Sequence, residues 1–191
     1  KQAKKISLKA TALFALAAFA VILPLQAVST LTGASGAKAA LEEAGEKALA
    51  TFTEGASAAA AENFTTASET FERTAHTLDT ASVRLAALNR DLLGIASILP
   101  TRGAEYKAAR HLLEAGESAA KSAATLAEGL DTISTRTTGG PASAILLFNV
   151  FAENALPDLQ DAARELSAVR LSALPAEKRA TISDAQQTLE E

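Results

Sequence analysis

The stretch FTTASETFERTAHTLDTASVRLAALNRDLLGIASIL, residues 64–99, determines the predicted fold class of this chain. Large apolar residues recur in it at every seventh position, and most residues three places further on are small. This spacing places one apolar seam along a helix that packs lengthwise on a neighbour, either in a coiled coil or in an ordinary bundle. The seam residues are Phe64, Phe71, Leu78, Leu85, Leu92 and Leu99.

Pro100 and Gly103 interrupt this periodicity. Because proline cannot continue a helix and glycine permits a turn, we predict one long helix over residues 37–99 and a returning helix over residues 104–136. Such a short turn joins antiparallel neighbours, so the expected fold is all-α: an antiparallel hairpin or elongated bundle of Ala-rich helices. The returning helix continues the seam, at multiples of seven residues, through Leu112, Leu126 and Ile133.

Residues 141–191 follow a second break, the sequence TTGGP. Their first part, ASAILLFNVF, is apolar on nearly all sides but too short to span a bilayer. We expect it to be buried in helix packing, and the alternative is contact with the membrane surface. Further amphipathic helices are predicted after Pro157 and after Pro175. No helix-stop signal precedes Glu191, so we expect the chain to continue into a C-terminal domain.

The N-terminal segment has the features of a membrane anchor. Residues 1–9 carry four lysines and no acidic residue, while residues 10–28 carry no charged side chain and span ~28 Å as a helix, close to the hydrocarbon thickness of a bilayer. The lysines predict a single-pass topology with a cytoplasmic N-terminus and an extracytoplasmic remainder. A cleaved signal peptide is the main alternative, and a buried core helix is a third. The predicted lipid-facing residues are Leu13, Phe14, Leu16, Phe19, Val21, Ile22 and Leu23.

Composition limits the kinds of partner and site. Hydrophobic residues make up 48% of the chain but aromatic residues only 4%, and much of the apolar fraction is alanine. That balance favours long helices in close contact over a bulky globular core. The net charge of −4 includes the lysines before residue 10, so the remainder is more acidic still, which argues against nucleic acid as a partner. The absence of cysteine excludes disulfides and thiolate metal sites.

No catalytic constellation is recognisable in the sequence. His111 and Glu114 lie one helical turn apart and resemble half of a carboxylate–histidine metal site, but no second such pair exists, so we interpret them as a solvated surface pair. Tyr106, Lys107 and Arg110 form either a small docking patch or, more simply, a solvated helix face. We therefore predict no enzymatic activity, no cofactor, no metal site and no small-molecule substrate.

Two runs resemble a known family: ILPTRGAEYKAARHLLEAGESAAKSAATLAEGL, residues 98–130, and ALPDLQDAARELSAVRLSALP, residues 155–175. Their layout is similar to the membrane-proximal helical region of the domain-of-unknown-function 4012 family of bacterial envelope proteins. The resemblance implies a cell-surface setting, handling of polysaccharide or other envelope material, and a larger α/β extracytoplasmic domain after the helices. It implies no functional residues within this stretch.

The expected function is that of a membrane-anchored extracytoplasmic scaffold or stalk, which acts by helix–helix packing. Its expected partners are the lipid bilayer and either further copies of the chain or partner helices. One alternative is a subunit of a surface filament, with the hydrophobic N-terminal helix in the fibre core. Another is the stalk of an enzyme or sensor whose functional domain lies beyond residue 191.

Overall fold

The computed structural model describes residues 35–96, 100–136 and 140–174, and beyond them residues 176, 179–180, 182–183 and 186–187. Every regular element in these residues is helical, which confirms the predicted all-α class. None of the described helices combines the length and apolar character that crossing a bilayer requires. The elements are α2 (Ser35–Ala60), α3 (Phe64–Ala96), α4 (Pro100–Arg136), α5 (Gly140–Ser167) and the short 3₁₀ helix η2 (Leu171–Ala173).

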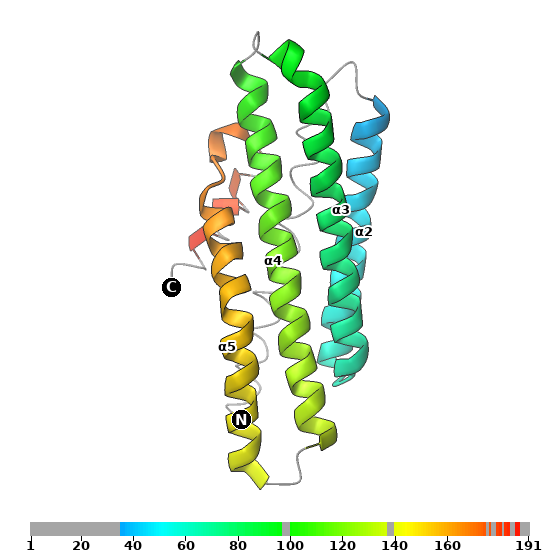
Figure 1. Cartoon of the computed structure of the whole chain (residues 1–191), viewed down its shortest axis with the longest axis vertical. Coiled ribbons are helices and arrows are strands. Elements are labelled where there is room, and N and C mark those ends of the chain that lie inside the picture. The colour runs from blue at the N-terminus through cyan, green and yellow to red at the C-terminus, as the bar shows by residue number, and fades with distance from the viewer. Residues whose placement is uncertain are drawn as a thin grey trace.

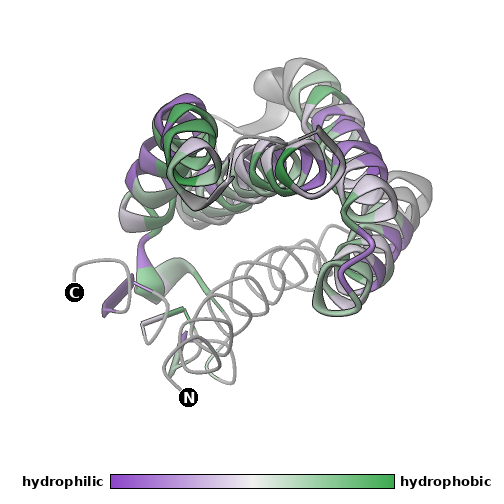
Figure 2. Cartoon of the chain, turned by 90° about the horizontal axis from the view of Figure 1, so that it is seen from below, coloured by the Kyte–Doolittle hydropathy of each residue, from purple (hydrophilic) through white to green (hydrophobic). Residues whose placement is uncertain are grey.

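The four long helices alternate in direction, and each packs chiefly on its neighbours in sequence (Figure 1). They form a curved row, with α2 and α5 at its two edges (Figure 2). Consecutive antiparallel packing is the expected result of the short connections between the helices. The row leaves each edge helix with one long neighbour instead of two among the described elements.

The predicted single helix over residues 37–99 is wrong, because the chain turns at Ala61–Asn63 and divides it into α2 and α3. The amide of Asn63 donates to the carbonyl of Ala58 at 2.9 Å, and the amide of Glu62 donates to that of Ala59 at 3.1 Å. With Glu62 at φ 60°, these bonds form a Schellman C-cap, a position that usually holds glycine. Asn63 then caps α3, since its Oδ1 accepts from the amide of Thr66 at 3.3 Å.

The additional turn changes which end of the molecule α5 starts from. A single long helix and a returning helix would bring residue 140 back toward the start of the long helix. In the structure α2 and α3 already form one hairpin, so α5 begins at the end opposite to Ser35 (Figure 1). The apolar start of α5 therefore lies far from the point where α2 begins.

The core lies on both sides of α4, which packs on α3 and on α5. Leu113 joins Leu78 and Leu85 of α3 in one cluster, whereas the neighbouring Leu112 joins Leu166 of α5 in another. Because α4 has two neighbours, its buried surface is wider than the one seam that the sequence indicated.

Most of the buried hydrophobic residues of α4 are alanines. A third cluster places the α2–α3 aromatic pair, with ring centroids 5.0 Å apart, among small residues of α4. Small side chains allow close backbone approach, which is how this Ala-rich chain packs with few bulky residues. The members of the cluster are Phe52, Ala67, Phe71, Ala75, Ala120, Ala123, Ala124 and Ala127.

Two predicted helix boundaries also differ. We expected Pro100 to end one helix and a new helix to begin near residue 104, but Pro100 is the first residue of α4, where the missing N–H is of no consequence. We expected a restart after Pro157, yet α5 continues through it. Pro157 is exposed, and α5 contacts α4 on both sides of it: Phe151 lies against Gly129, and Leu166 packs in the cluster of Leu112. These contacts stabilise the helix despite the backbone bond that proline cannot make.

Candidate functional site

The predicted seam is only partly buried. Phe71, Leu78, Leu85 and Leu112 are buried. Phe64, Leu126 and Ile133 are half-buried. Leu92 belongs to α3, whereas Leu99 and the predicted anchor lie outside the described residues. The buried members of the seam therefore form part of the interior of the described helices.

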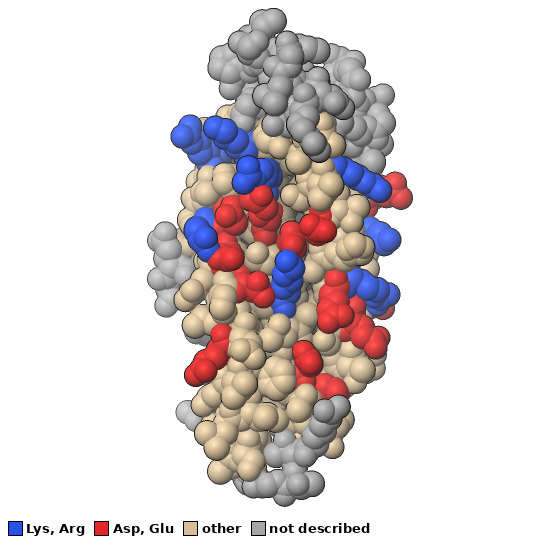
Figure 3. Space-filling model, in the orientation of Figure 1, with Lys and Arg blue, Asp and Glu red and all other residues tan. Residues whose placement is uncertain are grey.

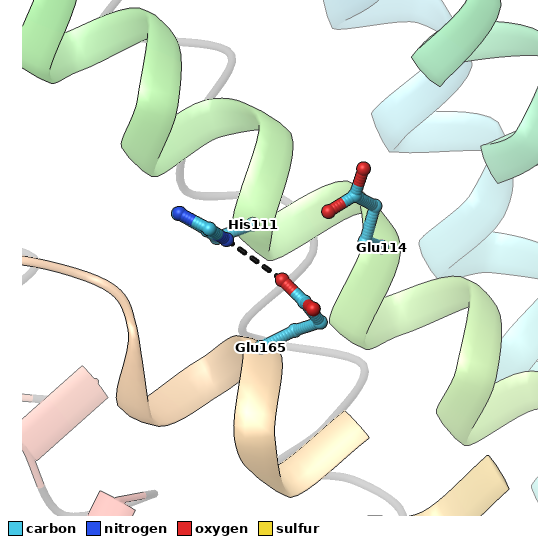
Figure 4. A group of neighbouring side chains, drawn as sticks. All are labelled: His111, Glu114 and Glu165. Carbon is cyan, nitrogen blue, oxygen red and sulfur yellow. Dashed lines mark hydrogen bonds and ion pairs between the residues drawn. The ribbon is translucent and has the colours of Figure 1, made fainter. Parts of the chain in front are cut away.

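A histidine and two carboxylates meet between α4 and α5 (Figure 4). His111 Nδ1 and Glu165 Oε2 are 2.7 Å apart, and each side chain is about one quarter exposed. Glu114 extends from the next turn of α4 toward the same side. The three residues can bring one ligand atom each within 4.8 Å of one another. The sequence predicted that His111 and Glu114 lie near each other, but it did not indicate Glu165. Glu165 comes close to them only because α5 packs on α4.

This cluster has the donor types that bind zinc, but its atoms are already paired. Glu114 Oε1 accepts a hydrogen bond from Arg110 Nε at 2.7 Å, and this bond raises the pKa of the guanidinium. A bound cation would displace the His111–Glu165 bond and lie close to the charge of Arg110. The arrangement therefore works as a polar link between two helices. His111 and Glu114 are not the simple solvated pair that we predicted.

An open groove of about 590 Å³ crosses α3, α4 and α5 and is strongly acidic. Figure 3 shows acidic side chains gathered over the middle of this face, with basic ones toward the end where α3 and α4 meet. Lys121 Nζ lies 2.6 Å from Glu117 Oε1, a hydrogen bond that raises the pKa of Lys121. The net charge of the groove favours cations over anions, but among the described residues its carboxylates do not form a group that could hold a metal ion. Its carboxylates are Glu72, Asp79, Glu117, Glu128 and Asp158.

The three residues considered as a docking patch have different surroundings in the structure. Tyr106 packs against the cluster around Leu78, and Arg110 is engaged with Glu114. Lys107 is exposed and takes part in neither of these contacts. The interpretation of these positions as a solvated helix face therefore stays a prediction.

The first half of α5 is exposed, so our prediction that ASAILLFNVF is buried is wrong. Leu147 and Phe151 are half-buried, but large apolar side chains around them face solvent. The reason is that α5 lies at the edge of the row, where α4 is the one long helix among the described elements that it packs against closely. The exposed fractions are 62% for Ile145, 67% for Leu146, 41% for Phe148 and 52% for Val150.

The exposed apolar surface continues along one side of α5 past its middle. Leu156 and Leu159 are 47% and 37% exposed, and Ala152 between the two groups is half-buried. At about 100° per residue these positions share one side of the helix. We call this row the α5 stripe: Ile145, Phe148, Ala152, Leu156 and Leu159. The sequence signal was present, in the apolar run at the start of α5, but the run did not reveal which side would lack a neighbour.

No protein-family model matches the chain, and no curated protein or solved structure matches it significantly. The resemblance to the domain-of-unknown-function 4012 family therefore stays a prediction.

Proposed function

We propose that this chain is a non-enzymatic helical scaffold of a bacterial cell envelope, tethered to the membrane by residues 10–28, that docks other helices through the α5 stripe. The exposure of the stripe carries this proposal. Rows of large apolar side chains in contact with water are unfavourable, and contiguous ones mark interaction surfaces. The stripe combines four such residues with a small one, the composition of a helix-packing face.

The opposite edge of the row provides an internal comparison. The helix α2 is also an edge helix, but its outward residues include Glu43, Glu46, Lys47 and Glu54, all exposed. The exposed side of α2 thus carries charged residues, whereas the α5 stripe of the same molecule carries large apolar ones. The contrast supports a docking role for α5 alone.

In this proposal the two ends of the helix array take different roles. The tether would enter at the start of α2, a helix of 26 residues and hence ~39 Å long. The start of α5 lies at the other end of that length (Figure 1). Such a scaffold would hold its docking face away from the lipid surface. A filament subunit would instead bury residues 10–28 against its neighbours, and a stalk for a downstream domain would use the same array as a spacer.

The tether is tested by extraction of the full chain from membranes of the cells that naturally carry it. We expect the protein to stay with the membrane through an alkaline wash and to be released by detergent. The variant Leu16→Arg with Phe19→Arg should be released by the wash, because each buried arginine costs ~2.5 kcal/mol or more at the centre of a membrane helix. Release of the wild-type chain without detergent would contradict the tether and favour the filament.

The docking face is tested by cysteine labelling, which has no background because the chain contains no cysteine. Leu156→Cys lies in the stripe, and Val83→Cys, at a position 59% exposed on α3, is the control. In native membranes we expect a membrane-impermeant maleimide to label the stripe variant at least ten times more slowly than the control. Purified, denatured samples should label equally. Equal rates in membranes would exclude docking through the stripe.

A further inference from the structure

The α5 stripe is symmetric about its small central residue. Ile145 and Leu159 lie seven residues before and after Ala152, and Phe148 and Leu156 lie four residues before and after it. A row with this mirror pattern presents the same sequence of large and small side chains in both directions. It is therefore complementary to itself when a second α5 runs the opposite way across it.

We infer that the α5 stripe binds the α5 stripe of a second copy of this chain, antiparallel, with a two-fold axis at Ala152. The inference rests on the proposed docking function and names the occupant of the face. The axis sets Ile145 of one copy against Leu159 of the other, and Phe148 against Leu156. The two alanines meet at the crossing point, where small side chains allow helices to approach closely.

Charge along α5 favours the antiparallel direction over the parallel one. Residues 140–152 carry no charged side chain, whereas the second half of the helix carries Glu153, Asp158, Asp161 and Glu165 against the single basic residue Arg164. A parallel pair would place the two acidic halves side by side, and juxtaposed like charges are unfavourable. The antiparallel pair places each acidic half beside the uncharged half of the other copy.

The same charges argue against a lipid surface as the occupant. Helices that lie on membranes carry lysine and arginine beside their apolar face, which attract anionic headgroups. The exposed residues on the open side of the stripe are instead the apolar Leu146, the neutral Asn149 and Gln160 and the acidic Glu153. The one basic residue on that side, Arg164, is paired with Asp161. An anionic membrane surface repels this acidic flank. A second copy of α5 instead places its uncharged half beside the acidic half of the first.

The architecture also sets the expected size and strength of the assembly. Pairing of α5 with α5 continues the up-and-down order of the row, and the charged outer side of α2 offers no second self-complementary edge. The contact therefore closes as a dimer. Fourteen residues of helix span ~21 Å. One helix pair of that length buries less than the ~800 Å² per partner of standard interfaces, so we expect micromolar association.

Disulfide crosslinking of the full chain in detergent tests both the partner and its direction. Ala152→Cys should form a disulfide-linked dimer on oxidation, because the two-fold axis brings its Cα atoms near the ~4.4–6.8 Å that a disulfide requires. Ile145→Cys should not crosslink to itself, since the antiparallel arrangement separates its two copies by ~21 Å. A mixture of Ile145→Cys and Leu159→Cys should give the crosslinked heterodimer, and Val83→Cys is the background control.

Each crosslinking result either supports or contradicts the antiparallel α5 pair. Efficient self-crosslinking of Ile145→Cys would show a parallel pair and overturn it, as would crosslinking of the stripe variants no faster than Val83→Cys. If the stripe variants crosslink no faster than Val83→Cys, slow maleimide labelling of Leu156→Cys in native membranes would still support the proposed docking function, with a different helix as partner. Rapid labelling there would instead remove that function too.

A charge variant supplies an independent measurement. Because Leu156 is an exposed position, Leu156→Glu should leave helicity and melting temperature unchanged while weakening dimerisation at least tenfold in sedimentation equilibrium. Val83→Glu should leave dimerisation unchanged. Unaltered association of Leu156→Glu would contradict the inference.

Discussion

At the scale of single residues, contacts between helices depend on small side chains at particular points. Gly129 of α4 is buried directly beneath Phe151 of α5. A Cβ atom placed on Gly129 would lie 2.6 Å from the Cβ of Phe151 and 2.5 Å from its Cγ. The Cβ position is fixed by the backbone of α5, so no rotation of the Phe151 side chain can relieve that overlap. The absence of a side chain at Gly129 thus sets the α4–α5 spacing.

We therefore predict that Gly129→Ala destabilises the fold. Alanine is the better helix former by ~1 kcal/mol, but overpacking at a helix contact costs ~1–3 kcal/mol. The expected net loss is about 1 kcal/mol in the free energy of unfolding, measured by urea denaturation. A gain of about 1 kcal/mol would show that α5 moves aside without cost.

Another residue-scale feature is the link formed by His111 and Glu165, which the sequence could not indicate. The two residues are 54 positions apart, and only the packing of α5 on α4 brings them within 2.7 Å. His111 with Glu114 follows from helical spacing alone. A partner on a different helix depends on register between helices, and that register is set by many packing contacts at once.

At the scale of elements, the α2–α3 turn is the feature that sequence reasoning missed. Helices commonly end at glycine or proline, and neither occurs at Ala61–Asn63. Glu62 instead adopts the left-handed conformation, at φ 60°, without the glycine that this position favours. The only local signal was Asn63, a good N-cap residue directly before Phe64.

Glu62→Gly should accordingly stabilise the protein. Left-handed conformations cost non-glycine residues roughly 1 kcal/mol, which exceeds the added entropy of a flexible glycine in the unfolded chain. We expect a gain of about 0.5 kcal/mol and a higher melting temperature by circular dichroism. Glu72→Gly, at an exposed position inside α3, is the matched control and should lower stability by ~1 kcal/mol. A loss of stability in Glu62→Gly would mean that its side chain has a role at the turn.

At the scale of the whole molecule, the cluster around Leu85 joins three helices. It combines Ala48 of α2, Leu78 and Leu85 of α3, and Leu113 of α4. An unpaired charge in that cluster would act on both interfaces of α3 simultaneously. The two packing interfaces of α3 should therefore be lost together.

Leu85→Asp should unfold the array. A buried unpaired carboxylate with the loss of a leucine side chain costs ~4 kcal/mol or more, a large part of the stability of a domain this size. Val83→Asp, two residues away at a position 59% exposed, should change stability by less than ~0.5 kcal/mol. Thermal denaturation followed by circular dichroism distinguishes them. Similar melting temperatures for the two variants would contradict a shared three-helix core.

The sequence by itself determined the all-α class found in the described residues, because alanine content and heptad spacing act within a few turns of one helix. It also identified Phe71, Leu78, Leu85 and Leu112 as packing residues. Only the tertiary structure decided where α2 ends and which edge helix keeps an apolar side. Both outcomes depend on which helices lie next to each other. Periodicity shows that a residue faces a neighbour, but not whether that neighbour belongs to the same chain.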